Sequence, residues 1–467
     1  MLDHIFRKYD IRGQVGKDLN IENVYDAARA IAFYFVEQNK LLKNVAIAMD
    51  GRLSSEDIKQ KVTNAFIDSG LNVIFLGVCP TPVFYFAMHN IQVDAGVMIT
   101  ASHNPKEDNG FKIICNKESV WNDQIQVIKN LFKNKINLTS KNKGTYSEYS
   151  IIDGYINWLA INFNHLKDSN IKILIDCANG AGSVIIPDLV KRMNWKNVEL
   201  KCEILDGNFP NHEPDPTVLE NIKDIKQHLQ NKKFDFAVGL DGDCDRLAVI
   251  DSFGNLLNGD QLLGIFSQFL QKSNEQNSVV FDVKCSSGLL ELLEKLKIKS
   301  CISPTGISYI KDMMKKNNAL LGGELSGHIC FRDRYFGYDD GIYAIMRIVE
   351  IVQESKKTIQ ELLSVFPKKI SSPEIRLQCA EEDKNSIISL VKSKLLSNSD
   401  FNLVEIDGIS VYTKYGWAIL RASNTQPMLS IRFEGNNPEG LLKIKQDFFN
   451  VLVESFDQNL LKNKFEI

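Results

Sequence analysis

The sequence predicts an α/β protein with three similar doubly wound, mixed α/β domains and a C-terminal α+β domain, arranged around a central cleft. Short β-rich runs alternate with helical segments over most of the chain, as in a mostly parallel sheet with helices on its faces. The pattern restarts twice, and longer strands replace it towards the C-terminus. A chain of 467 residues is long enough for several domains with separate cores.

The first predicted domain, residues 1–149, alternates strand and helix. Strands are expected at residues 44–50, 72–77 and 95–100, and an amphipathic helix follows the first of them. A further helix is expected near residues 84–90. This order indicates parallel strands joined by helical crossovers.

The second predicted domain, residues 150–254, repeats the pattern. Residues 171–182, IKILIDCANGAG, are typical of a strand, a glycine loop and the start of a helix. Residues 233–251 add a strand that ends in acidic residues.

The third predicted domain, residues 255–366, begins after the turn at Gly254 and Asn255. A strand is expected at 278–285 and a helix at 288–296. A later helix is expected to face a core, because one stripe of it is apolar at helical spacing: Ile342, Ile345, Val349 and Val352.

The fourth predicted domain, residues 367–467, follows a stretch in which proline, lysine and serine interrupt the periodicity. Longer strands at 408–425 and 427–435, flanked by two helices, indicate an α+β fold. Pro367 is a predicted hinge about which this domain closes over a ligand.

The charge balance argues against nucleic acid and membranes as partners. Lys and Arg number 55 against 58 Asp and Glu, so the net charge is −3 and there is no basic surplus. The first ten residues carry charges where a secretory signal would be apolar, and no apolar run is long enough to span a bilayer. We expect a cytoplasmic protein, a monomer or weak oligomer.

The nine cysteines form no CxxC pair and have no histidine at a zinc-ligand spacing. We expect most of them to be small buried apolar residues rather than disulfide partners.

Polar clusters stand where predicted strands end. They are TASHNP (100–105), DGDCDR (241–246), GELSGH (323–328) and RASNT (421–425), one from each predicted domain. Ligands of open α/β sheets bind beyond the carboxyl ends of the strands, so these clusters predict one shared cleft.

The cluster DGDCDR places Asp241, Asp243 and Asp245 at alternate positions. Carboxylates this close repel one another unless a cation neutralises them, and ligation by oxygen alone favours Mg²⁺. An EF-hand is excluded, because Arg246 and Ser252 stand where its glycine and glutamate belong. A solvated acidic turn is the structural alternative.

Ser102 and His103 follow a predicted strand. Neighbouring side chains at the end of an extended segment point to opposite sides, so a direct serine–histidine pair is not expected. A phosphorylated Ser102 would instead supply a further oxygen to the cation, with His103 and Lys112 balancing charge or moving protons. Taken alone, the hexapeptide is also typical of a turn.

The remaining clusters suit a phosphosugar. Glu324 and Ser326 would share one face of an extended segment and could bind adjacent hydroxyls, and Arg421 heads a group of donors suited to phosphate. Each of these two clusters, GELSGH and RASNT, is equally typical of a polar turn. Further cationic or polar groups near strand ends are Tyr9, Arg12, Arg246 and Lys284.

Two nucleotide-binding motifs are excluded. The loop after residue 176 has Ile185 where a dinucleotide fingerprint needs its third glycine, and Lys17 is followed by Asp18 rather than the Ser or Thr of a P-loop.

Together these segments resemble the α-D-phosphohexomutase family, in its phosphomannomutase/phosphoglucomutase branch. The similar segments run in order along nearly the whole chain: FRKYDIRG, TASHNPKEDNGFK, DGDCDRLAV, GELSGHICFRDRYFGYDDGIYA and RASNTQPMLSIRFE. The resemblance implies an isomerase that interconverts hexose 1-phosphate and hexose 6-phosphate of mannose, glucose or both. It also implies a phosphoserine and a hexose 1,6-bisphosphate intermediate.

The resemblance also implies the residue roles. One Mg²⁺ per chain would be held by phosphorylated Ser102 with Asp241, Asp243 and Asp245. The transferring phosphoryl group would be surrounded by His103, Lys112, Arg246 and His328, the last of which would also contact substrate. The cleft would be lined by Tyr9, Arg12 and Lys284, the sugar O3 and O4 held by Glu324 and Ser326, and the other phosphate gripped by Arg421, Ser423, Asn424 and Thr425.

Three positions depart from the family pattern: Cys244 replaces a frequent glycine, Leu325 is closer to the methionine of the hexose-phosphate enzymes, and Ile307 replaces a frequent histidine. The alternatives are a phosphoglucosamine mutase, a phosphohydrolase and a catalytically silent phosphosugar-binding protein. An intact Ser102 beside a metal loop argues against the last of these.

Overall fold

The computed structural model describes residues 3–136, 138, 140–271, 277–396, 400–422 and 427–467. These residues form two compact units. The first unit comprises Met1–Leu262 and Ser326–Leu362, and the second comprises Leu263–Leu325 and Leu363–Ile467.

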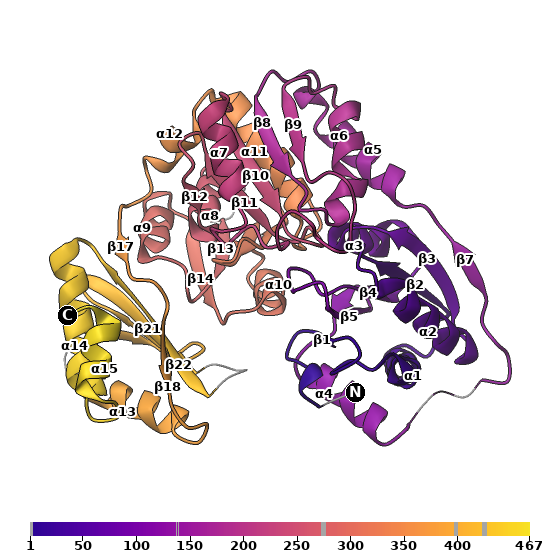
Figure 1. Cartoon of the computed structure of the whole chain (residues 1–467), viewed down its shortest axis with the longest axis horizontal. Helices are drawn as coiled ribbons and strands as arrows, with labels where there is room; N and C mark the ends of the chain where they lie inside the picture. Colours follow the sequence, from indigo (N-terminus) through magenta and orange to yellow (C-terminus); the bar gives the residue numbers. More distant parts are fainter. Residues whose placement is uncertain (1–2, 137, 139, 272–276, 397–399, 423–426) are drawn as a thin grey trace. The chain divides into compact units, whose positions relative to one another are not determined.

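The first unit begins with a mixed sheet in the strand order β1-β5-β4-β2-β3-β7 (Figure 1). Its strands are β1 (Ile11–Gln14), β2 (Asn44–Met49), β3 (Asn72–Val78), β4 (Ala95–Ile99), β5 (Asp108–Cys115) and β7 (Tyr146–Glu148), and β6 (Glu118–Ser119) pairs with β5. Strand β2 lies between β3 and β4 and is parallel to both, which confirms the predicted crossovers. Strand β5 was not expected; it runs antiparallel to β4.

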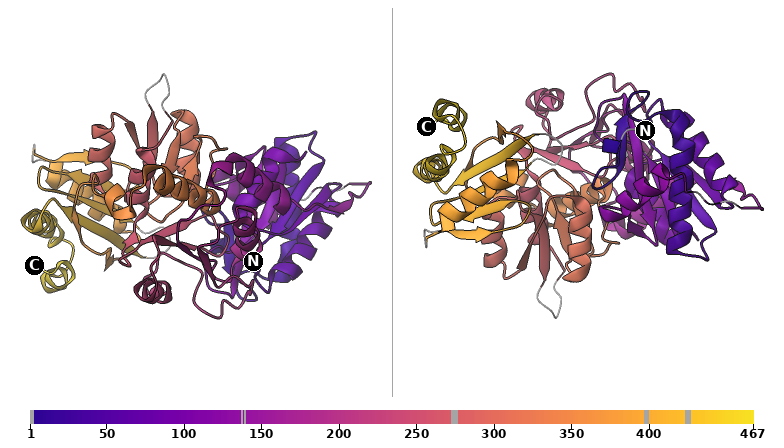
Figure 2. Two further views of the ribbon diagram at one scale, coloured as in Figure 1. Left: turned by 90° about the horizontal axis from the view of Figure 1, so that it is seen from above. Right: turned by 90° about the horizontal axis from the view of Figure 1, so that it is seen from below.

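Helices cover both faces of this sheet (Figure 2). They are α1 (Ile21–Gln38), α2 (Ser55–Asp68), α3 (Thr81–Asn90) and α4 (Asp123–Lys133). Helix α1 begins where the side chain of Asn20 accepts a hydrogen bond from the backbone of Glu22, which satisfies one open N–H. Its buried face brings Phe35 against Phe66 of α2 in the core beneath the sheet.

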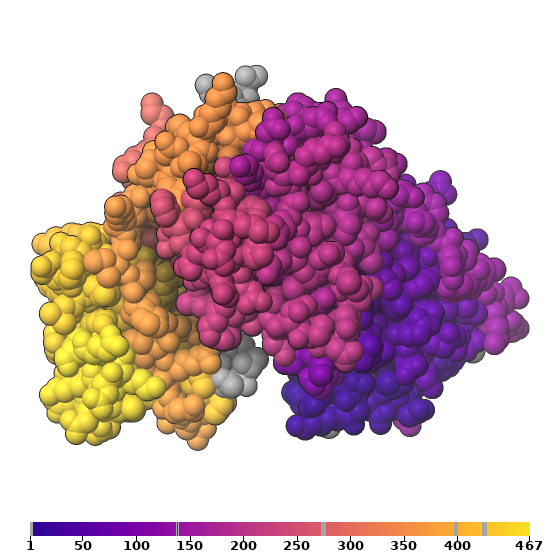
Figure 3. Space-filling view, turned by 45° about the horizontal axis from the view of Figure 1, so that its top comes forward, coloured from indigo at the N-terminus to yellow at the C-terminus, as the bar shows by residue number. Residues whose placement is uncertain are grey.

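A second sheet in the same unit has the order β12-β11-β10-β8-β9. Its strands are β8 (Ile173–Asp176), β9 (Val198–Lys201), β10 (Phe236–Leu240), β11 (Leu247–Asp251) and β12 (Leu256–Leu257). Strand β8 is parallel to β9 and β10, whereas β11 returns antiparallel along β10. The acidic cluster is the short connection between β10 and β11. In the space-filling view the chain segments that contain the two sheets, coloured indigo to magenta, adjoin one another at the surface (Figure 3).

Helix α11 (Gly341–Ser355) packs on β10 and β11 within the first unit. Its predicted apolar stripe is confirmed, because Ile342, Ile345, Val349 and Val352 are all buried. The other helices and strands wholly within this unit are α5 (Ile152–Asn162), α6 (Ile186–Arg192), α7 (Lys223–Asn231) and β16 (Ile329–Phe331). Helices α8 (Gly259–Ser267) and α12 (Ile359–Leu363) lie at its borders.

The second unit contains the parallel strands β13 (Ser278–Asp282), β14 (Lys299–Ser303) and β15 (Leu321–Gly323), with β13 between the other two. Helices α9 (Ser287–Lys295) and α10 (Ile307–Lys316) connect them. The α9 helix begins at Ser286, whose hydroxyl accepts a hydrogen bond from Gly288 N.

The same unit ends in an antiparallel sheet in the order β17-β22-β21-β20-β19 with β18 also on β22. The strands are β17 (Ile370–Ser371), β18 (Ile375–Gln378), β19 (Asn402–Val404), β20 (Ile409–Tyr412), β21 (Gly416–Ala422) and β22 (Met428–Gly435), and the helices are α13 (Lys384–Leu396), α14 (Pro438–Leu452) and α15 (Gln458–Phe465). The predicted class, mixed α/β domains followed by an α+β domain, is therefore confirmed.

All nine cysteines are free thiols in this structure, and seven of them are buried. None of the helices in the described part of the chain combines the length and apolar character that a bilayer crossing requires.

Candidate active site

Ser102 lies in the loop that joins β4 to β5 and is almost fully buried. Its Oγ donates a hydrogen bond to Asp241 Oδ2 at 2.8 Å and lies 3.1 Å from His103 Nδ1. The expectation that these neighbouring side chains point apart was wrong. Ser102 has φ +53°, a left-handed conformation that is uncommon outside glycine, and the chain is not extended there. Backbone strain of this kind clusters at functional sites.

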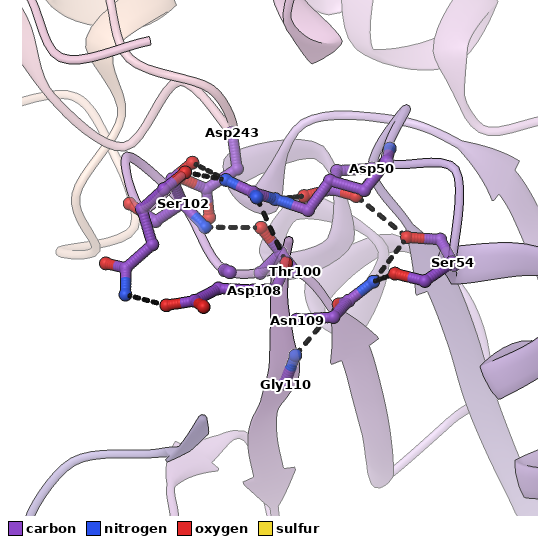
Figure 4. Close-up of polar contacts among 12 residues, drawn as sticks. Asp50, Ser54, Thr100, Ser102, Asp108, Asn109, Gly110 and Asp243 are labelled. Carbon is purple, nitrogen blue, oxygen red and sulfur yellow. Dashed lines mark hydrogen bonds and ion pairs between the residues drawn. The ribbon is translucent and has the colours of Figure 1, made fainter. Parts of the chain in front are cut away.

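Arg52, which the sequence interpretation missed, holds the serine loop. Figure 4 labels Ser102 and Asp108, whose carbonyl oxygens it contacts, and its ion-pair partner Asp50. The Arg52 guanidinium donates to the carbonyl oxygens of Ser102 at 2.8 Å and Asn104 at 2.6 Å, and also to those of Pro105 and Asp108. Its Nε pairs with Asp50 at 3.1 Å. The segment DGR directly after β2 could have suggested it, because that position is also the carboxyl end of a parallel strand.

The acidic loop, residues 241–246 between β10 and β11, packs directly against the serine loop, residues 100–107 between β4 and β5. A side chain on Gly242 would place its Cβ 2.4 Å from the carbonyl oxygen of Ser102, so only glycine allows this approach. Thr81, the first residue of α3, donates its backbone N–H to the carbonyl oxygen of Asp243 at 2.9 Å and its hydroxyl to the Asp243 carboxylate. The open N–H groups of this helix end favour the nearby negative charge.

The three carboxylates are buried and form one group that could hold a metal ion. Burial, and then the charges of Asp245 and Asp243, raise the pKa of Asp241 well above its usual value. Lys112 and His328 outweigh the effect of burial and hold the pKa of Asp245 below its usual value. The loop therefore carries more negative charge than its environment readily accommodates.

The acidic loop fits a divalent cation. Asp243 Oδ1 is buried and makes no hydrogen bond to any residue that the structure describes, although it is a strong acceptor. Carboxylate oxygens converge here without sulfur or nitrogen ligands, a set that suits Mg²⁺.

Lys112 stands on β5 opposite Met98 and reaches the acidic loop. Its Nζ lies 2.6 Å from Asp243 Oδ2 and also pairs with Asp245. Burial disfavours the ammonium, but these two carboxylates outweigh it and raise the pKa of Lys112 well above its usual value. Lys112 is therefore an ion-pair partner of two of the three aspartates.

The two histidines near Ser102 have different electrostatic surroundings. Burial, followed by Arg246 and Arg12, lowers the pKa of His103 well below its usual value, so its ring is neutral near pH 7. Burial also opposes charge on His328, but Asp245 and Asp339 raise its pKa overall. Such a divergence is typical of acid–base pairs.

His328 is held between opposite charges. Arg246 Nε donates to its Nε2 at 2.9 Å, so the ring proton belongs on Nδ1, which lies 3.1 Å from the carbonyl oxygen of Asp245 and 3.2 Å from Asp339 Oδ2. Asp339 was not predicted; it lies in the buried segment before α11 and orients this ring.

Arg12 donates hydrogen bonds to the serine loop. Its Nη1 donates to the carbonyl oxygen of Ala101 and to Asn104, both at 2.9 Å, and its Nη2 pairs with Asp10 at 2.6 Å. Tyr9, which precedes Arg12 in the same segment, is partly exposed. Arg12 is therefore a loop-positioning group here, in addition to its expected place near substrate.

Glu324 and Lys284 belong to the second unit. Glu324 is buried and accepts a hydrogen bond from Gly306 N at 2.6 Å, while Lys284 Nζ lies 3.7 Å from Asp282. Leu325 and Ser326 form a turn, so the extended arrangement that would place Glu324 and Ser326 on one face is absent. Asp282 fixes this turn by accepting from Leu325 N at 3.0 Å.

Arg421 lies at the end of β21, also in the second unit. Its Nη2 donates to Asp407 at 2.6 Å, and Asp407 also accepts from Thr305 N at 3.3 Å. The guanidinium Nε is buried and has no hydrogen-bond partner among the described residues. Ser423, Asn424 and Thr425, predicted to share the same phosphate, lie outside the described residues.

The site contains a buried serine that is hydrogen-bonded to one of several clustered carboxylates, and lysine, arginine and histidine lie around them. Such a set of groups at the strand ends of α/β sheets is typical of enzymes that transfer phosphoryl groups. The fold and this site define that class.

The chain matches the four domains of one family over most of its length. The alpha/beta/alpha domains I, II and III of phosphoglucomutase/phosphomannomutase match residues 3–138, 153–254 and 258–370, and the C-terminal domain matches residues 374–451. The chain belongs to the phosphoglucomutase/phosphomannomutase family, as the sequence motifs predicted. It is an isomerase that interconverts hexose 1-phosphates and hexose 6-phosphates.

Relatives support this assignment over nearly their full lengths. A phosphomannomutase/phosphoglucomutase of Pseudomonas syringae pv. tomato is 40% identical over 451 residues, which is 96% of this chain and 94% of that protein. A phosphoglucomutase of Neisseria gonorrhoeae is 36% identical over 97% of both chains. The solved structure of a phosphoglucomutase/phosphomannomutase family protein of Burkholderia thailandensis has a TM-score of 0.87 at 30% identity, covering 96% of this chain and 97% of that one.

Proposed function

We propose that this mutase works through a phosphoserine at Ser102 and a hexose 1,6-bisphosphate, with Mg²⁺ at Asp241, Asp243 and Asp245. The observation that carries the proposal is the 2.8 Å contact between Ser102 Oγ and Asp241 in a buried acidic loop. A phosphoryl group on Oγ would add its oxygens to the carboxylates at that point. The bound cation would neutralise this charge and polarise the transferring group.

In the forward half-reaction a hydroxyl of the hexose monophosphate attacks the phosphorus, and the bond to Ser102 Oγ breaks as the new O–P bond forms. The attacking hydroxyl loses its proton, and the neutral ring of His103 can accept one. Lys112 and Arg246 balance the charge on the phosphoryl oxygens. After the bisphosphate has turned end for end, the same groups act in reverse and its other phosphate returns to Ser102.

Both orientations of the bisphosphate have to fit one sugar site. We assign O3 and O4 to Glu324 and Ser326, because these neighbouring hydroxyls occupy similar places before and after the turn. Arg421, Ser423, Asn424 and Thr425 would hold the phosphate that does not react, and we assign further substrate contacts to Lys284, Tyr9 and Arg12. Contacts to O3 and O4 leave the configuration at C2 weakly recognised.

The test compares the turnover of glucose 1-phosphate, mannose 1-phosphate and glucosamine 1-phosphate. We expect the glucose and mannose substrates to have kcat/KM values within about tenfold of each other, since they differ only at C2. Rejection of one epimer by several orders of magnitude would contradict the O3/O4 assignment. Preference for the amino sugar would favour a phosphoglucosamine mutase instead.

The same assay separates the mutase from a hydrolase and from a silent binding protein. A mutase transfers the phosphoryl group without net release of inorganic phosphate, a hydrolase releases one phosphate per turnover, and a binding protein produces neither product. The charged substrates do not cross membranes, so we place the enzyme in the cytoplasm, as a monomer or weak oligomer.

Asp407 is expected to position the phosphate-binding arginine. Replacing it with asparagine removes the charge that holds Arg421 but keeps an acceptor for Thr305 N. A charge-assisted hydrogen bond is worth about 1.5–3 kcal/mol, so KM should rise roughly tenfold or more. Because the non-reacting phosphate is held equally in ground and transition states, kcat should change little.

The matched control is Glu405→Gln, which breaks the ion pair between Glu405 and Lys392 at the surface of the same segment. It should leave both constants unchanged. If Asp407→Asn lowered kcat at unchanged KM, the positioning role would be wrong.

A further inference from the structure

We propose that the second sheet carries another metal site, for a zinc-class divalent cation, formed by Asp176, Cys202 and His212. These residues lie at the end of β8, directly after β9 and in the long connection that follows β9. One ligand atom from each lies within 4.8 Å of the others. The three residues are widely spaced along the chain, so no short zinc-binding motif in the sequence indicates them.

The separations suit ligands of one ion. His212 Nε2 lies 3.0 Å from Asp176 Oδ2 and 3.9 Å from Cys202 Sγ. Zinc binds nitrogen and oxygen at about 2.0–2.2 Å and sulfur at about 2.3 Å, so ligand atoms of a tetrahedral site stand roughly 3.3–3.7 Å apart, within about 0.5 Å of these two separations. The three groups supply three ligands, and a water would complete a tetrahedron.

The histidine is already oriented as a metal ligand. Its Nδ1 lies 2.8 Å from the carbonyl oxygen of Glu213, an arrangement in which Nδ1–H donates and Nε2 faces Asp176 and Cys202. Metal-binding histidines commonly donate their other ring N–H to such an acceptor. Asp176 is oriented in the same way, because its Oδ1 accepts from Ala178 N at 2.8 Å and its Oδ2 faces the imidazole.

The cluster also supplies negative charge at the place where the ion would bind, because Asp176 is buried and its Oδ2 lies 3.0 Å from His212 Nε2. A divalent cation would replace the proton on Nε2 and would also bind the thiol in its deprotonated form.

The two metal sites would select different ions. A thiolate and an imidazole favour zinc, whereas the all-oxygen set of the acidic loop favours Mg²⁺. The sites are also connected, because segments that lead from the cluster contact Gly242 of the acidic loop. Ala181 N donates to Gly242 O at 2.9 Å, and Gly242 N donates to Pro214 O at 3.2 Å. Binding at the cluster would therefore steady the acidic loop from both sides.

The test titrates the metal-stripped full-length protein with Zn²⁺ in a large excess of Mg²⁺ and measures bound zinc after equilibrium dialysis. We expect one tightly bound zinc per chain, and Cys202→Ser and His212→Gln should each weaken its binding at least about tenfold. Co²⁺ in place of zinc should give a thiolate-to-metal charge-transfer band that Cys202→Ser abolishes. These readouts are independent of mutase activity.

Two controls locate the ion. Cys379→Ser removes a partly exposed thiol in the other unit, and His165→Gln removes the histidine of a second cluster, with Glu350 and Glu354. Both should bind zinc as the wild type does. Absence of retained zinc, equal binding by Cys202→Ser, or loss of binding only in His165→Gln would each overturn the proposal. Cys202→Ser changes one atom, so it keeps the test valid even where His212→Gln fails to fold.

Discussion

Replacing Ser102 with alanine is expected to lower mutase activity by at least about 10⁴-fold, the scale on which loss of a catalytic nucleophile acts. The substitution removes Oγ and therefore both the proposed phosphoryl carrier and the hydrogen bond to Asp241. A coupled assay with glucose 1-phosphate measures the loss. Intact mass should show a fraction of wild-type chains heavier by one phosphoryl group, and that fraction should disappear in the variant.

The neighbouring substitution Ser54→Ala is the control. Ser54 lies at the start of α2 and accepts a hydrogen bond from Asn109 Nδ2 at 2.9 Å, away from the carboxylates. It should retain activity within a few-fold and still acquire the phosphoryl group. If Ser102→Ala kept wild-type activity, or if the wild type were never phosphorylated in the presence of a hexose 1,6-bisphosphate, the mechanism would be wrong.

Replacing Asp241 with asparagine is expected to separate stability from activity. The ionised Asp241 is disfavoured because its pKa in the folded protein is raised, so the metal-free wild type loses stability as the pH rises above the usual range of a carboxyl. Asparagine removes that charge and can still accept from Arg246 N. Without metal, the free energy of unfolding of the variant should exceed that of the wild type by about 1–2 kcal/mol near pH 7.

Mg²⁺ should make the wild type more stable than the Asp241→Asn variant. At about one hundred times its dissociation constant the ion adds roughly 2.7 kcal/mol to the stability of the wild type, and the variant should gain much less. With the ion bound more weakly, the transferring phosphoryl group loses several kcal/mol of charge stabilisation. The activity of the Asp241→Asn variant should therefore fall by at least about 100-fold. Denaturant unfolding with a chelator and with Mg²⁺ measures the stabilities.

The control Asp224→Asn changes an exposed aspartate on α7. It should leave the stability, the effect of Mg²⁺ and the activity unchanged. A metal-free Asp241→Asn protein that is less stable than the wild type, or one that Mg²⁺ stabilises equally well, would contradict the account of the acidic loop.

Residues that belong to compact motifs could be predicted from the sequence. The three aspartates sit at alternate positions directly after a strand, and Ser102 also follows a strand, so their types and places were enough to suggest a shared site. The pairing of β10 with β11 then closes the acidic loop in the tight connection that these spacings require.

Other residues depend on distant partners and could not be predicted in this way. Arg52 binds carbonyl oxygens some fifty positions away in the chain, and Asp407 meets Arg421 only because β20 and β21 are paired. The position of Arg52 in the segment directly after β2 marks it only as a candidate, and Asp407 has the local pattern of an ordinary surface charge, so the partners of both residues follow from the fold. The contact between Ser102 and His103 was misjudged because a left-handed residue follows from the packing of the loop and not from the identity of serine.

The packing of α11 on β10 and β11 has a consequence for biosynthesis. The sheet that carries the aspartates is encoded before residue 258, but Ile342 and Val349, which cover it, emerge from the ribosome much later. Until then the nascent chain exposes an apolar sheet face, so this half of the molecule cannot complete its folding in the order in which it is translated.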